Sequence, residues 1–322
     1  MRARRLWPVL ALTALAVWPW VASRYFVFLA SLVLVNVVVA IGLNLLSGYT
    51  NQLSFGHAGF LAVGAYVAAL TTIHAPGVPV VITLLIAGAF TAAVGLAFGV
   101  PCLRLGGLYL SMATLAFGFV ITEAILNLDT LTKGADGLRV PAARLGGWAL
   151  TTDTTRYYLT AVVAVLLVAA AVNLVRTRPG RAFLALRESE IAAQASGIPV
   201  ALYKTAAFGL SAFYTGVAGG LFAFVVGFLS PDAFDVFLSV DFVVMIIVGG
   251  LGSVPGSIVG AAVVTVLYDW LAAFQNYRPL IFGAILVVVM LFMPGGIASA
   301  AARLRGVWGP SVVGPQRKRR SS

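Results

Sequence analysis

Repeated apolar runs, each close to the thickness of a membrane, are the feature that most constrains this chain. The sequence is 61% hydrophobic and only 10% charged over its 322 residues. Soluble domains carry about 25% charged residues, so this chain lacks the side chains needed to cover a water-facing surface. About ten apolar runs follow one another, and ~20 residues of helix are enough to cross a bilayer. The sequence therefore predicts an all-α polytopic membrane protein with about ten transmembrane helices, some of them short or broken.

The expected spans divide nearly the whole chain among them. The first run follows Arg2, Arg4 and Arg5, but no small-residue cleavage site with a polar mature start comes after it, so we interpret it as a retained span. The eighth and ninth runs are short, which predicts tilted, broken or re-entrant segments. We assign residues 1–308 to one transmembrane domain and the basic, Pro/Gly/Ser-rich residues 309–322 to a disordered cytoplasmic tail. The expected spans are 6–22, 25–46, 55–73, 79–100, 108–128, 157–175, 205–229, 234–249, 256–273 and 280–297.

The basic residues fall mainly on one side of these spans. With the N-terminus inside, 15 of the 21 Lys and Arg residues lie in cytoplasmic segments. The outer segments hold only Arg24, Lys133, Arg139, Arg144, Arg156 and Arg278. This bias predicts that both termini are cytoplasmic. The net charge of +11 is spread in short clusters between apolar runs, which favours contact with anionic lipid over a nucleic-acid groove.

The segment 176–204 is the one long polar stretch with good helix formers. After RPGR at 178–181, residues 182–196 contain neither Gly nor Pro, and Gly197 and Pro199 follow them, so we expect one helix there. Helices that lie on a membrane surface usually carry a Lys/Arg-rich polar face, whereas two glutamates occupy the middle of this one. The pattern favours a helix that docks in a groove of a partner over one resting on lipid. Its expected apolar stripe is Leu184, Ile191, Ala195 and Ile198.

Two segments enter a helix through glycine breaks and form a weak internal repeat. SGYTNQLSFGHAGFLAVGAY carries Gly56 and Gly64, and VGGLGSVPGSIVGA carries Gly252, Gly256 and Gly260 at four-residue spacing. Small-residue faces allow helix backbones to approach closely in a membrane. Paired glycine-interrupted segments are also the pattern of a central pathway built on repeats. Both interpretations, simple packing and a pathway, stay open for these glycines.

A group of neutral polar residues surrounds the first glycine break. Amides and hydroxyls can line a route for a zwitterion without trapping it, and a helix N-terminus can face a carboxylate. Hydrogen bonding between helices is the alternative, and for His57 a packing role competes with proton transfer. The sequence shows no carboxylate pair, Ser-His-Asp set or metal-ligand spacing, so neither an enzyme nor a metal site is expected. The candidate pathway residues are Asn44, Ser47, Asn51, Gln52, Ser54 and His57.

Several motifs resemble one family of transport proteins. RESEIAAQASGI, whose part EIAAQASG runs from Glu190 to Gly197, resembles the Glu-Ala-Ala…Gly loop through which ABC-importer permeases contact their ATPase. The runs LNLLSGYTNQLSFGHAGFLAVGAY, LRLGGLYLSMATLAFG, KGADGL and VGGLGSVPGSIVGA occur in the matching order. Over residues 33–297 the chain thus resembles LivM-type branched-chain amino acid permeases of the LivH/LivM family.

The resemblance implies the membrane subunit of an ATP-driven importer in the cell inner membrane, and not an enzyme. Its implied partners are a second, LivH-type permease, two cytoplasmic ATPases and an external solute-binding protein. ATP and Mg would bind the ATPases, and this chain contains no G-x-x-x-x-G-K-[ST] loop. Branched-chain amino acids are the first expected substrate, with urea, short amides and other small solutes as alternatives. An ion-coupled secondary transporter is the other class considered. The implied ATPase-coupling residues are Arg187, Glu188, Glu190, Ala192, Ala193 and Gly197.

Overall fold

A computed structural model describes residues 13–102, 105–145 and 148–274, together with isolated residues between 280 and 297. This described part is helical apart from four two-residue strands and the connecting loops. Residues 13–21 are helical, and α2 (Arg24–Leu43) follows them and runs directly into the π-helical turn η1 (Asn44–Gly48). The other long helices are α3 (His57–His74), α4 (Val80–Cys102), α5 (Leu108–Asn127), α7 (Asp153–Arg176), α10 (Val200–Val226), α11 (Val236–Gly249) and α12 (Val254–Trp270).

Six of the described helices are long and apolar enough to cross a membrane. They are Arg24–Gly48, His57–His74, Val80–Cys102, Leu108–Asn127, Asp153–Arg176 and Val200–Val226. Each lies on one of the second to seventh expected spans, so the chain is a multi-pass helical membrane protein. The eighth and ninth expected spans coincide with the shorter helices α11 and α12. The tenth, 280–297, lies mostly outside the described residues, and the tail 309–322 lies wholly outside them.

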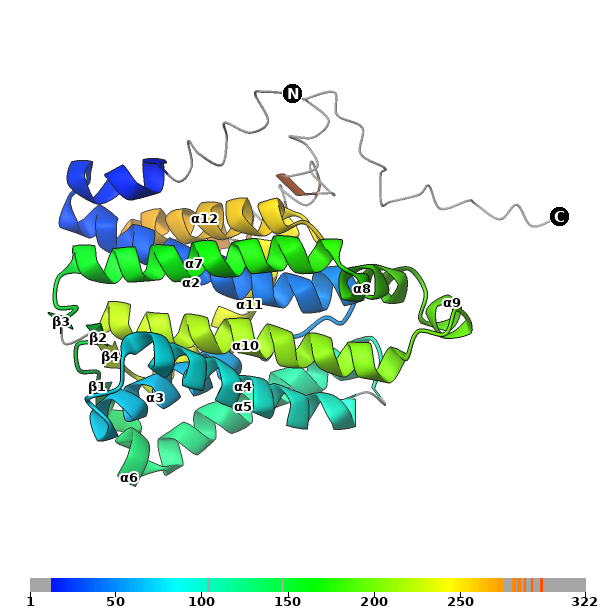
Figure 1. Cartoon of the computed structure of the whole chain (residues 1–322), viewed down its shortest axis with the longest axis horizontal. Coiled ribbons are helices and arrows are strands. Elements are labelled where there is room, and N and C mark those ends of the chain that lie inside the picture. The colour runs from blue at the N-terminus through cyan, green and yellow to red at the C-terminus, as the bar shows by residue number, and fades with distance from the viewer. Residues whose placement is uncertain are drawn as a thin grey trace.

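Helix α10 forms the centre of the bundle. In its most apolar 18-residue window 78% of the residues are buried, against 28% for α5 and 22% for α7. α10 packs against α2, α3 and α4, and Figure 1 shows it crossing the middle of the molecule between two groups of helices. The contact with α3 is made backbone to backbone, because a Cβ placed on Gly64 would lie 2.5 Å from Gly216 Cα. Small residues permit this close approach where lipid provides no hydrophobic drive between helices.

The two ends of the bundle carry different structures. At one end β1 (Leu138–Arg139) pairs antiparallel with β4 (Phe228–Leu229), and β2 (Arg144–Leu145) pairs with β3 (Trp148–Ala149). The β1–β4 pair joins the segment between α6 and α7 to the segment that follows α10. The short helices α8 (Arg178–Glu188) and α9 (Glu190–Ala195) lie at the opposite end (Figure 1). Short helices α6 (Asp129–Thr132), η2 (Gly134–Asp136), η3 (Pro231–Phe234) and η4 (Leu271–Phe274) complete the described elements.

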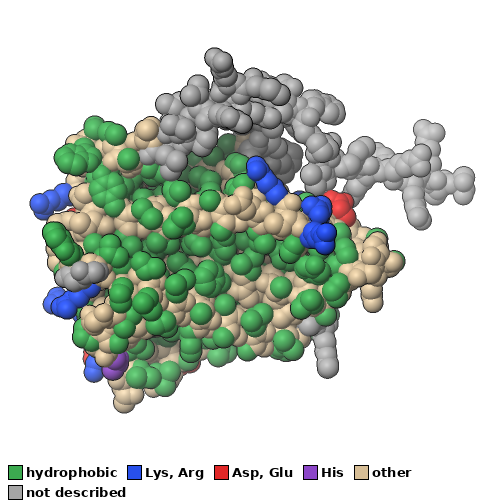
Figure 2. Space-filling model, viewed as in Figure 1, with side chains coloured by type: hydrophobic (Ala, Val, Ile, Leu, Met, Phe, Trp, Pro, Cys, Tyr) green, Lys and Arg blue, Asp and Glu red, His purple; other side chains and the backbone are tan. Residues whose placement is uncertain are grey.

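The face between the ends is apolar. Figure 2 shows hydrophobic side chains over this side of the bundle, with Lys and Arg gathered at its two ends. Such a belt of exposed apolar side chains would be an aggregation surface in water and is the ordinary lipid-facing surface of a membrane protein.

Candidate functional site: a docking loop and a polar junction

The polar segment 176–204, called the α8–α9 loop below, forms two helices where the sequence predicted one. The prediction of a single helix over residues 182–196 is wrong, because Ser189 has extended backbone angles (φ −164°, ψ 117°) and separates α8 from α9. The Ala192 N–H donates a hydrogen bond to Ser189 Oγ at 3.2 Å. A serine that caps a new helix in this way offers the backbone an alternative to continuing the old one. α8 also begins earlier than expected, since Pro179 occupies its first turn, where a missing N–H leaves no hydrogen bond unmade.

The end of α9 matches the expectation from sequence. Gly197 adopts a left-handed conformation with φ +80°. Its N–H donates to Gln194 O at 3.0 Å, and the Ile198 N–H donates to Ala193 O at 3.1 Å. This pair of bonds is the Schellman motif, in which glycine supplies the positive φ at little steric cost. The expected stop at Gly197 is confirmed.

The buried face of the loop differs from the expected stripe. Phe183 and Leu186 are buried, and the Phe183 ring packs edge-on against Tyr203 of α10 with ring centroids 6.1 Å apart. In contrast, Ile191 is 84% exposed, and Ala195 is exposed as well. The predicted stripe assumed one continuous helical phase. The extended residue Ser189 resets that phase, so the apolar positions of α8 and α9 no longer share a face.

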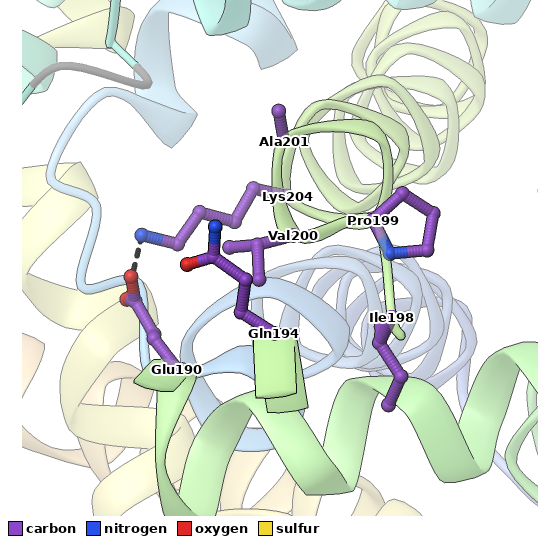
Figure 3. Close-up of a pocket in the computed structure, with 7 residues that line it drawn as sticks. All are labelled: Glu190, Gln194, Ile198, Pro199, Val200, Ala201 and Lys204. Carbon is purple, nitrogen blue, oxygen red and sulfur yellow. Dashed lines mark ion pairs between the residues drawn. The ribbon is translucent and has the colours of Figure 1, made fainter. Parts of the chain in front are cut away.

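An ion pair ties α9 to α10. Lys204 Nζ lies 2.6 Å from Glu190 Oε1, and the Lys204 side chain is 11% exposed while that of Glu190 is 52% exposed. Figure 3 shows the two side chains reaching toward each other, Glu190 from α9 and Lys204 from α10, the helices that Ile198 and Pro199 connect. An open pocket of about 360 Å³ lies here, lined by Glu190, Gln194, Ile198, Pro199, Val200, Ala201 and Lys204. Sequence reasoning missed this pair, because only the reversal of the chain after Gly197 brings the two residues together.

The expected coupling residues fall into two groups. Glu188, Glu190, Ala192 and Gly197 are exposed at the end of the bundle, whereas Ala193 is buried. Arg187 is half-buried and points to a different place. Its Nη1 occupies the space that a Cβ on Gly252 would fill. It also interacts electrostatically with the buried Tyr49.

Asn44 joins the two glycine-broken segments. Its Nδ2 donates to Ser253 O at 3.1 Å and to Ser257 Oγ at 2.6 Å, and its Oδ1 accepts from the Gly252 N–H at 2.8 Å. The backbones themselves also touch, since a Cβ on Gly48 would lie 2.5 Å from Gly252 N. We call this contact between residues 44–49 and 250–257 the polar junction. Segments that are about 200 residues apart in sequence therefore meet side by side.

Other candidate pathway residues make hydrogen bonds of their own. Ser47 Oγ donates to Gln52 O at 2.9 Å, and Gln52 Nε2 donates to Thr50 Oγ1 at 2.7 Å. His57, fully buried, lies between Ser54 Oγ at 3.2 Å from its Nδ1 and Ser211 Oγ of α10 at 2.7 Å from its Nε2. Asn51 is exposed and has a positive φ of 58°. Five of the six residues are therefore buried and hydrogen-bonded, and Asn51 is exposed.

The remaining expected packing glycines also lie at close approaches. A Cβ on Gly56 would lie 2.5 Å from Thr114 O of α5. One on Gly256 would lie 2.6 Å from Gly249 O, and one on Gly260 would lie 2.8 Å from Gly249 N. α11 and α12 thus pack through glycine at the point where both meet the polar junction. Among the described residues, no group of three or more His, Cys, Asp or Glu side chains could hold a metal ion.

Comparison with known proteins places these features in a family. The family model described as "Branched-chain amino acid transport system / permease component" matches residues 25–293. The chain belongs to this permease family. The family is a transporter component and not a family of enzymes, so the permease is a transport protein. No solved structure matches the permease significantly.

Curated relatives of the permease carry two related names. The high-affinity branched-chain amino acid transport system permease protein LivM of Escherichia coli (strain K12) is 35% identical over 314 residues, covering 90% of this chain and 74% of the relative. LivM of Salmonella typhimurium is 34% identical over 314 residues, which again cover 90% of this chain and 74% of the relative. LivH of Salmonella typhimurium is 24% identical over 278 residues, or 81% of this chain and 90% of the relative. The permease is thus similar to both members of a named pair.

Proposed function

We propose that this permease forms the translocation pathway of an ATP-driven importer for branched-chain amino acids. The observation that carries the proposal is the α8–α9 loop, which is held firmly on the bundle and presents an exposed face. Its inner side is fixed by Phe183 and Leu186, while its outer side exposes Glu190, Gln194 and, at 84%, Ile191. This supported and exposed segment, which from Glu190 to Gly197 resembles the ATPase-contacting loop of ABC-importer permeases, fits a protein-docking surface.

The partners follow from this loop and from the family. One of two cytoplasmic ATPases docks on the α8–α9 loop, and the ATPases rather than this chain bind ATP and Mg. A LivH-type permease completes the pathway, because LivM and LivH relatives are both similar to this chain. An external solute-binding protein delivers the substrate at the end of the bundle that carries β1–β4.

The orientation follows the charge bias of the sequence. We place the α8–α9 loop and both termini in the cytoplasm, within the cell inner membrane. The basic residues of the loop, which include Arg176, Arg178 and Arg181, then face the anionic lipid of the cytoplasmic leaflet. The opposite end, with the β1–β4 pair, faces the outside.

The substrate route passes the buried polar region around the first glycine break. Neutral amides and hydroxyls fit a zwitterionic amino acid, which needs hydrogen bonds but no fixed counter-charge. Urea and short amides would suit the same chemistry, so uptake must be compared between them. The residues proposed to line the route are Asn44, Ser47, Asn51, Gln52, Ser54 and His57.

The test uses the permease with its partner permease, ATPases and binding protein in proteoliposomes. The variant Glu190→Arg with Gly197→Trp reverses a charge and adds bulk on the exposed loop. We expect it to insert and fold but to lose ATPase binding and ATP-dependent leucine uptake. The control is Asp232→Arg with Gly77→Trp, two exposed positions in other loops, of which Gly77 has open space around it. The control should bind the ATPases normally.

Two results would count against the proposal. Full ATP-dependent uptake by the loop variant would remove the docking role of α8–α9. Uptake of urea or a short amide, with no uptake of leucine, isoleucine or valine, would keep the importer but change its substrate.

A further inference from the structure

Arg187 does not share the exposed face of the other coupling residues. It is in the last turn of α8, and its guanidinium lies against the backbone of Gly252. Gly252 has φ +74°, and its N–H donates to Asn44 Oδ1 at 2.8 Å. The Gly48 carbonyl oxygen borders the same point, 3.1 Å from where a Cβ on Gly252 would stand. One arginine of the α8–α9 loop thus lies directly against the polar junction.

The charge of Arg187 suits this place. η1 ends at Gly48, and α11 ends at Gly249, so two helix C-termini converge at the junction. Helix C-termini carry partial negative charge, and a cation near them is stabilised. Tyr49, which is hydrogen-bonded to the backbone of Val254, also interacts electrostatically with Arg187. The arginine therefore lies beside both segments of the junction.

The same helix, α8, also supports the exposed surface of the α8–α9 loop on which an ATPase is proposed to dock. The buried side chains of Phe183 and Leu186 fix α8 against the bundle, and both lie within about one helical turn of Arg187. On the other side of Arg187, α9 begins at Glu190, just beyond the break at Ser189. α8 is a rigid element because its backbone hydrogen bonds are internal. A displacement of α8 along or around its axis must change the position of Arg187 against Gly252.

We propose that Arg187 is a positioning residue that transmits movement of the α8–α9 loop to the polar junction between η1 and residues 250–257. The proposal rests on the proposed function, in which ATPases dock on this loop. Arg187 itself is the transmitting contact, and it does not supply the affinity for the ATPases. The positive φ of Gly252 favours glycine, and the guanidinium of Arg187 occupies the space beside its Cα.

The test compares Arg187→Gln with Arg181→Gln in the reconstituted importer. Arg181 is an exposed arginine of the same helix whose Nη1 donates to Arg176 O at 3.3 Å, away from the junction. Three quantities are measured: ATPase binding, ATP hydrolysis, and leucine molecules imported per ATP hydrolysed. For Arg187→Gln we expect binding and hydrolysis within about twofold of the parent, with import per ATP reduced about tenfold, a usual size for coupling between sites. Arg181→Gln should leave the ratio unchanged, and Arg187→Lys should restore part of it.

A second variant approaches the contact from the other side. Gly252→Ala places a methyl group where Arg187 Nη1 lies and should lower the same ratio, whereas Gly227→Ala, which has a similar positive φ but open space around it, should not. Thermal melting of each variant in detergent separates this effect from loss of folding, because misfolded protein lowers uptake and hydrolysis in parallel and leaves the ratio unchanged.

The outcomes separate this proposal from the proposed function. A parent complex without ATP-dependent uptake would overturn the proposed function. A parent complex that imports leucine, with Arg187→Gln importing as much per ATP as Arg181→Gln, would overturn the role of Arg187 alone. Loss of ATPase binding in Arg187→Gln would also overturn it, since Arg187 would then be a docking contact.

Discussion

Lys204 Nζ and Glu190 Oε1 lie 2.6 Å apart and form an ion pair that closes the turn between α9 and α10. Lys204 is almost fully covered, while half of Glu190 is open to solvent. Only the short helix α9 and a turn separate the two residues along the chain, so the pair is a local clamp that holds the α8–α9 loop.

Glu190→Gln should loosen α9. The substitution leaves the covered Lys204 ammonium without its counter-charge, but exposure of Glu190 screens the interaction, so we expect a loss of about 1 kcal/mol in the free energy of local opening. Hydrogen–deuterium exchange of the α9 amides measures this. Glu188→Gln is the control, because Glu188 is exposed and lies outside this ion pair. Equal exchange in both variants would mean that the clamp contributes nothing.

Asn44→Ala should destabilise the permease strongly. It removes three hydrogen bonds across the polar junction and leaves the Gly252 N–H without that acceptor. We expect a loss of about 2–3 kcal/mol, against about 1 kcal/mol for Asn36→Ala, whose side chain donates one bond to Thr265. Thermal melting in detergent compares the two. A similar melting temperature for both would contradict the bridging role of Asn44.

Gly64→Ala should disturb the packing of α3 on α10. The added methyl group would meet the backbone of Gly216 at a distance that no rotamer change can relieve. Overpacking of this kind costs about 1–3 kcal/mol, seen as a lower melting temperature. Gly77→Ala has open space around it and should melt like the parent. Unchanged melting of the Gly64 variant would show that the two helices can separate freely.

Tyr66→Phe should leave stability unchanged or raise it by about 1 kcal/mol. The Tyr66 hydroxyl is buried and has no hydrogen-bond partner within the described part of the chain, and an unsatisfied buried polar group is unfavourable. Tyr214→Phe is the matched control, because its hydroxyl donates to Leu167 O at 3.0 Å and its loss should cost about 1 kcal/mol. If the Tyr66 variant melts lower than the Tyr214 variant, a partner such as bound water must satisfy the Tyr66 hydroxyl.

The positions of the long helices could be read from the sequence. The expected spans 25–46 and 108–128, for example, differ by only one or two residues from Arg24–Gly48 and Leu108–Asn127. Hydropathy is a property of each segment by itself, and a membrane requires every apolar run to become a helix. The same holds for the stop at Gly197, because a positive φ is a local demand that glycine meets.

The candidate site was only partly predictable. The docking loop and the polar residues around the first glycine break were recognised, but the break at Ser189 was missed, since serine caps helices and also occurs within them. The predicted apolar stripe was wrong for the same reason, because it assumed one continuous helix. The contacts of Asn44 with Gly252 and Ser257 had no sequence signal beyond the glycine pattern, because they join residues that are far apart along the chain.

The sequence by itself determined that the chain is a bundle of membrane helices with a polar loop that stands out of lipid, because hydropathy, charge and helix-ending residues act segment by segment. Only the tertiary structure decided that Arg187 rests on Gly252, that Asn44 bridges the two broken segments and that Lys204 meets Glu190. Those contacts depend on which helix faces pack together, and packing is settled by the fit of all the helices at once.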